Sequence, residues 1–199
     1  MGTFKFEGAN DSISKVIVYG LDGNDNIKVN STVGVMAWLF GGAGDDKLRG
    51  GKGDDLLVGG AGNDMLDGKD GRDIVIGGLG ADKLKGHKDE DILIAADTAY
   101  DDNLAASCNI QKEWLKLDAD GQGDGEDHED SSARAAAIQD TYFGGGLLGG
   151  AGFTIDDGAK DELKGGSGAD WFIAHDVEDK IKDDDEDLFG IDTDWFDAN

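Results

Sequence analysis

The residues that decide the fold run from position 41 to 94, as GGAGDDKLR, GGKGDDLLV, GGAGNDMLD, GKDGRDIVI, GGLGADKLK and GHKDEDILI without a gap. Each nine-residue unit carries an aspartate at its sixth place and an aliphatic residue at its eighth place. The six aspartates are Asp46, Asp55, Asp64, Asp73, Asp82 and Asp91. Self-similarity at a short fixed period is typical of solenoids, in which every repeat packs only on its neighbours.

Further copies of the unit lie on both sides of this block. GLDGNDNIK begins at Gly20, while DDGAKDELK, GGSGADWFI and AHDVEDKIK begin at Asp156, Gly165 and Ala174. Their sixth-place aspartates are Asp25, Asp161, Asp170 and Asp179. The pattern predicts an N-terminal cap with the first coils over 1–40 and a central roll over 41–97. It also predicts an insertion over 98–146, made of a helix, an acidic EF-hand-like loop and a second helix, then a second repeat block with a C-terminal cap over 147–199.

The charge of the chain points to cations as its partners. The 199 residues include 44 acidic and 18 basic ones, for a formal net charge of −26. Repulsion on that scale opposes compaction unless cations are bound. The basic residues are scattered among carboxylates along the sequence, so we expect no nucleic-acid binding. We expect no membrane span, because no apolar run reaches about 18 residues, and the start at Met1 lacks the basic and apolar regions of a secretory signal.

The composition of the loops favours calcium over other metals. The chain has 34 glycines and no proline, so its loops can turn sharply and aim carbonyl oxygens inward. A carboxylate at the sixth place adds a hard anionic oxygen, and flexible oxygen cages suit calcium. Magnesium demands a stricter octahedron, and zinc or copper would need the sulfur and imidazole ligands that one cysteine and three histidines hardly supply.

These units resemble the RTX, or haemolysin-type, calcium-binding nonapeptide repeat. The resemblance implies a mainly β fold, a parallel β-roll or right-handed β-solenoid, with two units per turn. The first six residues of a unit would form a loop and the last three a short strand. Several calcium ions would lie between loops stacked 18 residues apart, with four interior sites in the uninterrupted block.

The resemblance also implies the calcium ligands, which are the sixth-place aspartates and the backbone carbonyls of the first, third and fifth residues of each loop. The implied set is Asp25, Gly41, Ala43, Asp45, Asp46, Gly50, Lys52, Asp54, Asp55, Gly59, Ala61, Asn63, Asp64, Gly68, Asp70, Arg72, Asp73, Gly77, Leu79, Ala81, Asp82, Asp91, Asp161, Asp170 and Asp179.

A second period lies inside the first, because the strand triplets alternate between KLR, MLD, KLK and LLV, IVI, ILI. Side chains of a strand alternate between its faces, so the central residue of a triplet points inward and its neighbours point outward. One outer face is therefore apolar, and residues 38–40 extend it if 29–40 is a half-turn with a three-residue insertion. Its core members are Leu56, Val58, Ile74, Ile76, Ile92 and Ile94.

An apolar face of this size needs a cover. Residues 101–117 carry Leu104, Cys108, Trp114 and Leu115 at helical spacing, and we expect this helix to pack on the face. The alternative is a protein partner or self-association through the same face.

The loop DADGQGDGEDHE at 118–129 resembles an EF-hand. Its candidate ligands are Asp118, Asp120, Gln122, Asp124 and Glu129, although Gln122 at the fifth place and Gly125 at the eighth depart from the usual pattern. The alternative is a solvated acidic linker without a metal.

We predict no catalysis by this chain, since it has no P-loop, no HExxH helix and no GxSxG elbow. The expected function is a calcium-binding module whose folding is coupled to calcium binding. By resemblance to large bacterial RTX proteins it is extracellular and exported by a type I system, with a C-terminal signal at DWFDAN. The alternative is a structural or adhesive module that calcium rigidifies and that engages a partner through its apolar face.

Overall fold

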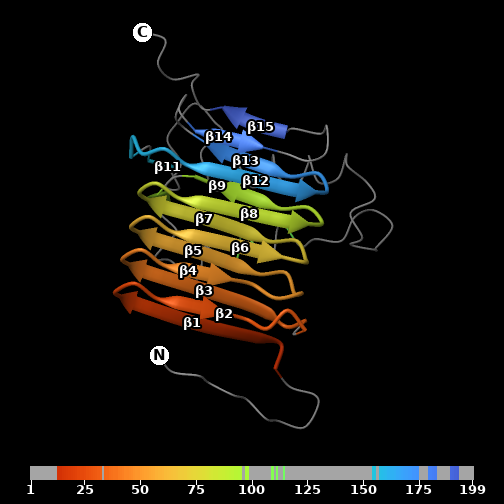
Figure 1. Ribbon diagram of the computed structural model, residues 1–199. Coiled ribbons are helices and arrows are strands. Elements are labelled where there is room, and N and C mark those ends of the chain that lie inside the picture. Colours follow the sequence, from red (N-terminus) through yellow and green to blue (C-terminus); the bar gives the residue numbers. More distant parts are fainter. Residues whose placement is uncertain are drawn as a thin grey trace.

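The protein is a stack of short parallel strands that form two facing sheets. The computed structural model describes residues 13–32, 34–95, 97–98, 109, 111, 114, 154–155, 157–174, 179–182 and 189–192. Figure 1 shows the strands stacked along one axis, with β1 at one end of the stack and β15 at the other. This parallel β-solenoid confirms the mainly β fold that the nonapeptides predict.

Each sheet collects every second strand of the chain. Sheet A runs in the order β1 (Lys15–Asp22), β3 (Met36–Ala43), β5 (Leu56–Ala61), β7 (Ile74–Leu79), β9 (Ile92–Ile94), β13 (Trp171–Ala174) and β15 (Phe189–Asp192). Sheet B runs in the order β14 (Lys180–Lys182), β12 (Glu162–Ser167), β8 (Lys83–Lys88), β6 (Met65–Lys69), β4 (Lys47–Arg49) and β2 (Asn26–Lys28). The glycine-rich loops connect the two sheets at both edges of the stack (Figure 1).

The register shows how the repeat builds the stack. In the central block each residue pairs with the one 18 positions later, as in Leu56 opposite Ile74. At the first coil Lys15 lies opposite Met36, which is 21 positions later, so the expected three-residue insertion within 29–40 is confirmed. After β9 the partner of Ile92 is Trp171, 79 positions later. The second repeat block therefore stacks directly on the first.

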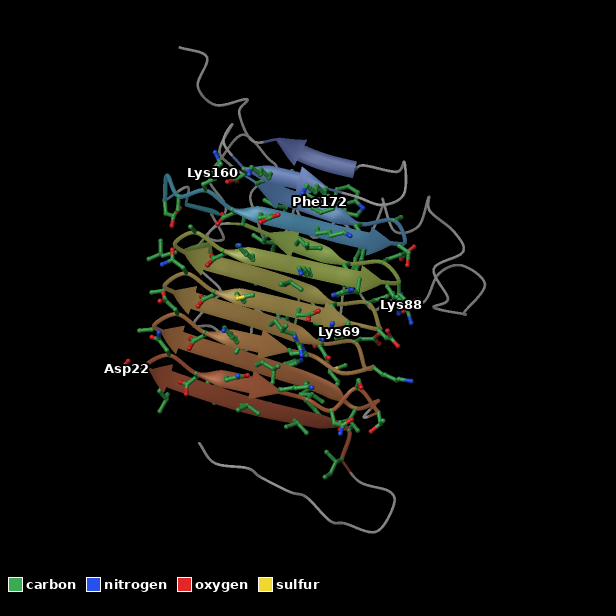
Figure 2. The ribbon with its side chains drawn as sticks, in the orientation of Figure 1. Asp22, Lys69, Lys88, Lys160 and Phe172 are labelled. Atoms are coloured by element: carbon green, nitrogen blue, oxygen red, sulfur yellow. The ribbon has the colours of Figure 1, made fainter. Side chains whose placement is uncertain are left out.

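The central residues of the triplets from Leu48 to Phe172 point into the roll, as predicted, whereas Ile181 in the last coil is 37% exposed. The interior cluster between the sheets includes Leu48, Leu57, Leu66, Val75, Leu84, Leu93 and Phe172, and all of these are fully buried. Figure 2 shows Phe172 near the far end of the stack, among the last coils. The alternating strand triplets thus form one continuous core along the axis.

The outward residues of sheet A form a second buried cluster. Trp38, Phe40, Leu56, Val58, Ile74, Ile76, Ile92 and Ile94 are at most 8% exposed, and Trp114 lies in the same cluster with no exposure. The indole N–H of Trp38 donates to Gln111 Oε1 at 2.5 Å, and Gln111 Nε2 donates to the Asp54 carbonyl at 2.8 Å. The 101–117 segment thus contributes at least two side chains to this face.

No helix is among the elements of the part of the chain that the structure describes, so the predicted helical insertion as a whole is not supported. Of the segment 101–117 only Asn109, Gln111 and Trp114 are described, and these three residues have helical conformation, so a helix over the whole segment stays a prediction. The two ends of the insertion are held together by a short antiparallel pair, β10 (Asp97–Thr98) and β11 (Thr154–Ile155). Within the described ranges the structure contains no helix long and apolar enough to cross a membrane.

Candidate metal centre

The loops between the sheets stack backbone on backbone, which explains their glycines. Gly42 has a φ of 111° and Gly60 a φ of 105°, and residues other than glycine rarely adopt such values. A Cβ atom at Gly60 would lie well inside 3.0 Å of the Gly42 carbonyl in the preceding coil. Glycine at the second place therefore lets successive loops approach closely enough for their oxygen atoms to meet.

The sixth-place aspartates form two buried columns, one at each edge of the stack. Asp46, Asp64, Asp82 and Asp161 lie in one column and Asp55, Asp73, Asp91 and Asp170 in the other, each at most 3% exposed. In both columns the Oδ1 atom accepts the backbone N–H of the preceding coil. Asp46 donates to Asp64 at 2.7 Å, and Asp55 donates to Asp73 at 2.7 Å.

The same hydrogen bond crosses the large insertion unchanged. The Asp82 N–H donates to Asp161 Oδ1 at 2.7 Å, and the Asp91 N–H donates to Asp170 Oδ1 at 2.9 Å. Asp161 in turn donates to Asp179 at 2.9 Å, and Asp25 donates to Asp46 at 2.6 Å. The carboxylate ladder thus runs from the first coil into the last repeat block.

The second carboxylate oxygen of most of these aspartates is buried and unpartnered. Among the described residues, the Oδ2 atoms that accept no hydrogen bond include those of Asp46, Asp64, Asp73, Asp82 and Asp91. Asp55 differs, because its Oδ2 accepts the N–H of Gly51 at 2.7 Å. A buried ionised oxygen without a partner is costly, so these atoms require either a proton or a cation.

Each unpartnered oxygen faces the first residue of its own loop, and at two of the loops a carbonyl of the next coil faces the same point. A Cβ atom built at Gly41 would lie well inside 3.0 Å of both Asp46 Oδ2 and the Gly59 carbonyl. The same convergence occurs at Gly59, between Asp64 Oδ2 and the Gly77 carbonyl. Glycine at the first place therefore keeps a small space open between a carboxylate oxygen and a carbonyl oxygen.

Burial raises the pKa of the column aspartates. It raises the pKa from 3.8 to about 6 at Asp55 and Asp64, and to about 8 at Asp82. At Asp73 and Asp91 burial is again the main cause of a pKa well above 3.8, and the neighbouring column carboxylates add to the rise. The carboxylates of the roll therefore hold protons tightly wherever no cation neutralises them.

Some of the carbonyls implied as ligands already accept hydrogen bonds. At the third place, the Ala43, Ala61 and Leu79 carbonyls accept from Gly23, Gly44 and Gly62 at 2.7 to 2.8 Å. No group of three or more His, Cys, Asp or Glu side chains converges in the part of the chain that the structure describes. A cation in these loops would therefore be held by one carboxylate per loop and by backbone oxygens, first-place carbonyls above all.

A second ladder of hydrogen bonds runs along the outside of the loops, between residues at the fifth place. It was not predicted from the sequence, because only the backbone carbonyl of the fifth residue was expected to have a role. Asp45 Oδ1 accepts the Asn63 N–H at 2.9 Å, and Asn63 Oδ1 accepts the Ala81 N–H at 3.0 Å. On the other edge Asp54 Oδ1 accepts the Arg72 N–H at 3.0 Å. The hydrogen bonds from Asn63 lower the pKa of exposed Asp45, in contrast to its buried neighbour. The recurrence of Asp and Asn at the fifth place is the signal that could have shown this.

The remaining predicted residues fall into three groups. Gly50, Gly68 and Gly77 are buried at the first place of their loops, whereas Lys52 is exposed and Asp70 is half-buried. Arg72 is buried although it carries a charge. The EF-hand-like loop at 118–129 lies outside the described residues. Gln111 was not predicted, yet it joins the loop carbonyl of Asp54 to the apolar face.

The fold and the two aspartate columns define the class of protein: it is a parallel β-roll with buried oxygen atoms between stacked loops. Residues 38–66 and 67–97 match the family model for the RTX calcium-binding nonapeptide repeat, with four copies. This stretch therefore consists of RTX calcium-binding repeats. Comparisons with curated proteins and with solved structures found no match.

Proposed function

We propose that the chain is a calcium-binding β-roll whose folding is coupled to calcium binding. The observation that carries this proposal is the set of five buried Oδ2 atoms, from Asp46, Asp64, Asp73, Asp82 and Asp91, that accept no hydrogen bond among the described residues. Stacked carboxylates in a dry environment repel one another, so a calcium-free roll is disfavoured at neutral pH. A divalent cation removes both the repulsion and the unpartnered charge.

The donor set supports calcium as this cation. Residues that would hold an ion include Asp46 and the Gly59 carbonyl at one edge, and Asp73 with the loop of Gly68 at the other. These are hard oxygen atoms on a flexible glycine-rich backbone, which calcium accepts in irregular numbers. When bound, the ion supplies positive charge between adjacent coils.

Binding free energy then becomes folding free energy. At a free calcium concentration of about 100 times the dissociation constant, one independent site adds about 2.7 kcal/mol to the stability of the folded state. Four such sites would add about 11 kcal/mol, which is comparable with the total stability of about 5 to 15 kcal/mol of a usual domain. The roll can thus change from unfolded to folded with calcium alone.

We further propose that this coupling serves export. The chain would stay unfolded where calcium is scarce, pass through a type I system, and fold outside the cell. RTX repeats occur in secreted bacterial proteins, which supports this extracellular assignment.

The test is far-UV circular dichroism of the whole chain in excess chelator and in excess calcium at neutral pH. We expect strand signal to appear only with calcium and to be lost again on chelation. Identical strand content in the two solutions would contradict the coupling. Calorimetric titration under the same conditions would count the ions.

We propose that residues 101–117 form the helix that covers the apolar face. Trp114 is fully buried in the cluster on that face, and Gln111 fixes the position of the segment through Trp38 and Asp54. The rival idea, a module that engages a partner through its apolar face, is not favoured. The central members of the face from Trp38 to Ile94 are at most 8% exposed within one chain.

A further inference from the structure

The outer face of sheet B gathers a large share of the basic residues of this acidic protein. Its six strands present twelve outward side chains, which are the first and third residues of each triplet. Eight are basic, two are acidic, and the other two are Asn26 and Met65. The basic ones are Lys28, Lys47, Arg49, Lys83, Lys85, Lys164, Lys180 and Lys182, and together with Asp67 and Glu162 they define the basic face.

The basic face carries a net charge of +6, from eight cations less two anions, on a chain of net charge −26. It uses eight of the 18 lysines and arginines of the whole sequence. The expectation that the basic residues are scattered holds along the sequence but not in the fold. The 18-residue period brings lysines from separate repeats into adjacent positions.

The register arranges these charges in two rows. One row runs through Lys28, Arg49, Asp67, Lys85, Lys164 and Lys182, and the other through Asn26, Lys47, Met65, Lys83, Glu162 and Lys180. Neighbouring strands lie about 4.8 Å apart, so each row is roughly 24 Å long, and the rows are about 7 Å apart. The basic face is therefore a long, narrow and flat strip.

The two acidic side chains neutralise only part of the strip. Asp67 binds Arg49 at 3.1 Å and Lys69 at 2.8 Å, and it also contacts His87. Glu162 lies 3.9 Å from Lys83 and 3.8 Å from Lys182, distances at the limit of an ion pair. Lys28, Lys47, Lys85 and Lys180 have no carboxylate partner among the residues that the structure describes. These charges are available to an external anion.

We propose that the basic face binds a linear acidic polysaccharide, a chain that carries carboxylate or sulfate groups at regular intervals. Charge complementarity and shape favour this occupant, because a narrow polyanion can lie along both rows. A globular protein partner is disfavoured, since Met65 is the single apolar side chain among the twelve and stable interfaces have an apolar centre.

Other polyanions fit less well. Single-stranded nucleic acid is bound by stacking its bases on aromatic side chains, and none of the twelve outward residues is aromatic. An anionic bilayer is flat and wide, so contact with the basic face would also bring it against the loop edge. That edge carries the exposed carboxylates of Asp22, Asp45 and Asp157 (Figure 2 shows Asp22 there).

The experiment measures binding of the whole chain, in excess calcium, to dextran sulfate and to hyaluronate, with uncharged dextran as the negative control. The test variant is Lys83→Ala with Lys85→Ala, at the centre of the strip. The matched control is Lys88→Ala with Lys160→Ala, which removes the same charge from exposed residues at the two loop edges, outside the basic face (Figure 2 shows both). Circular dichroism establishes that both variants fold like the parent chain.

We expect binding to a charged polysaccharide, weaker at high salt, with about a tenfold loss in the test variant and less than about a twofold loss in the control. Equal losses in both variants, or no binding, would overturn the proposal. Tighter binding to duplex DNA or to phosphatidylserine vesicles would overturn it too. If the chain keeps its strand content in chelator, the calcium coupling fails, but the polysaccharide assay still reports on the basic face.

Discussion

Substitution of one column aspartate by asparagine separates a metal-binding role from a packing role. Asp64 is 1% exposed, its Oδ1 accepts the Asp46 N–H at 2.7 Å, and its Oδ2 accepts no hydrogen bond among the described residues. Asp64→Asn preserves the shape of the side chain and the Oδ1 acceptor. It removes the charge that we assign to a cation.

The expected effect has opposite signs with and without calcium. Burial raises the pKa of Asp64 from 3.8 to about 6, which corresponds to a cost of about 3 kcal/mol for the ionised group at neutral pH. Without calcium, the variant should therefore be more stable than the parent chain by up to about 3 kcal/mol. At a calcium concentration of about 100 times the dissociation constant, loss of one site should make it less stable by about 2.7 kcal/mol.

The assay is unfolding by urea in calcium and in chelator, followed by circular dichroism, together with calorimetric counting of bound ions. Asp45→Asn is the matched control, because Asp45 is an exposed aspartate in the coil before Asp64, and its Oδ1 accepts hydrogen bonds from Asn63 that an asparagine could also accept. We expect this control to leave the calcium-dependent stabilisation unchanged. If Asp64→Asn destabilised the chain equally in both solutions, the carboxylate would serve packing and hydrogen bonding alone, and the reasoning would be wrong.

Three further predictions follow from the same geometry. Without calcium, the carboxyls of Asp64 and Asp82 have pKa values of about 6 and about 8, above the unfolded value of 3.8. Their contribution to the stability of the calcium-free fold is therefore fully present below about pH 4 and is lost as the pH rises to about 8. Calcium affinity rises over the same range. Circular dichroism measured against pH, with and without chelator, should show both trends. Gly59→Ala should abolish one calcium site and weaken folding, because its Cβ would lie well inside 3.0 Å of Asp64 Oδ2. Gly34→Ala, which has open space around it, should change neither the ion count nor the stability. An unchanged ion count in Gly59→Ala would contradict the site. Trp114→Ala should lower the free energy of unfolding in calcium by about 3 to 5 kcal/mol, because Trp114 is fully buried. Asn109→Ala, at an exposed position, should change this free energy little. Similar urea midpoints for the two variants would show that Trp114 does not help to cover the apolar face.

The coil of the roll could be predicted from the sequence because its determinants are local. The eighth-place residues Leu48 to Leu93 fill the interior as the alternation requires, and the apolar outer row lies on sheet A. The sixth-place aspartates were singled out by their period, and the structure places them in two buried columns. Each of these features depends on a single unit and on its neighbour one turn away.

Features that depend on several units at once were harder to predict. Gln111 forms hydrogen bonds with Asp54 and Trp38, which lie 57 and 73 positions earlier in the chain, and no periodic pattern marks it. The outer ladder of Asp45 and Asn63 was overlooked because a fifth-place Asp or Asn is also explained by loop composition. The basic face appears only when residues from six strands are aligned, since each triplet contributes at most two lysines or arginines.

The uninterrupted register across the insertion indicates that the coils themselves specify the stacking. Between β9 and β13 the offset grows from 18 to 79 residues, yet Asp91 still donates to Asp170 as Asp73 donates to Asp91, both at 2.9 Å. Closing the longer loop costs only about 1.3 kcal/mol more, because the entropy of closure grows with the logarithm of length. One calcium site between the two coils, at about 2.7 kcal/mol, would exceed that cost. The insertion can therefore vary in length and content while the ladder continues through it.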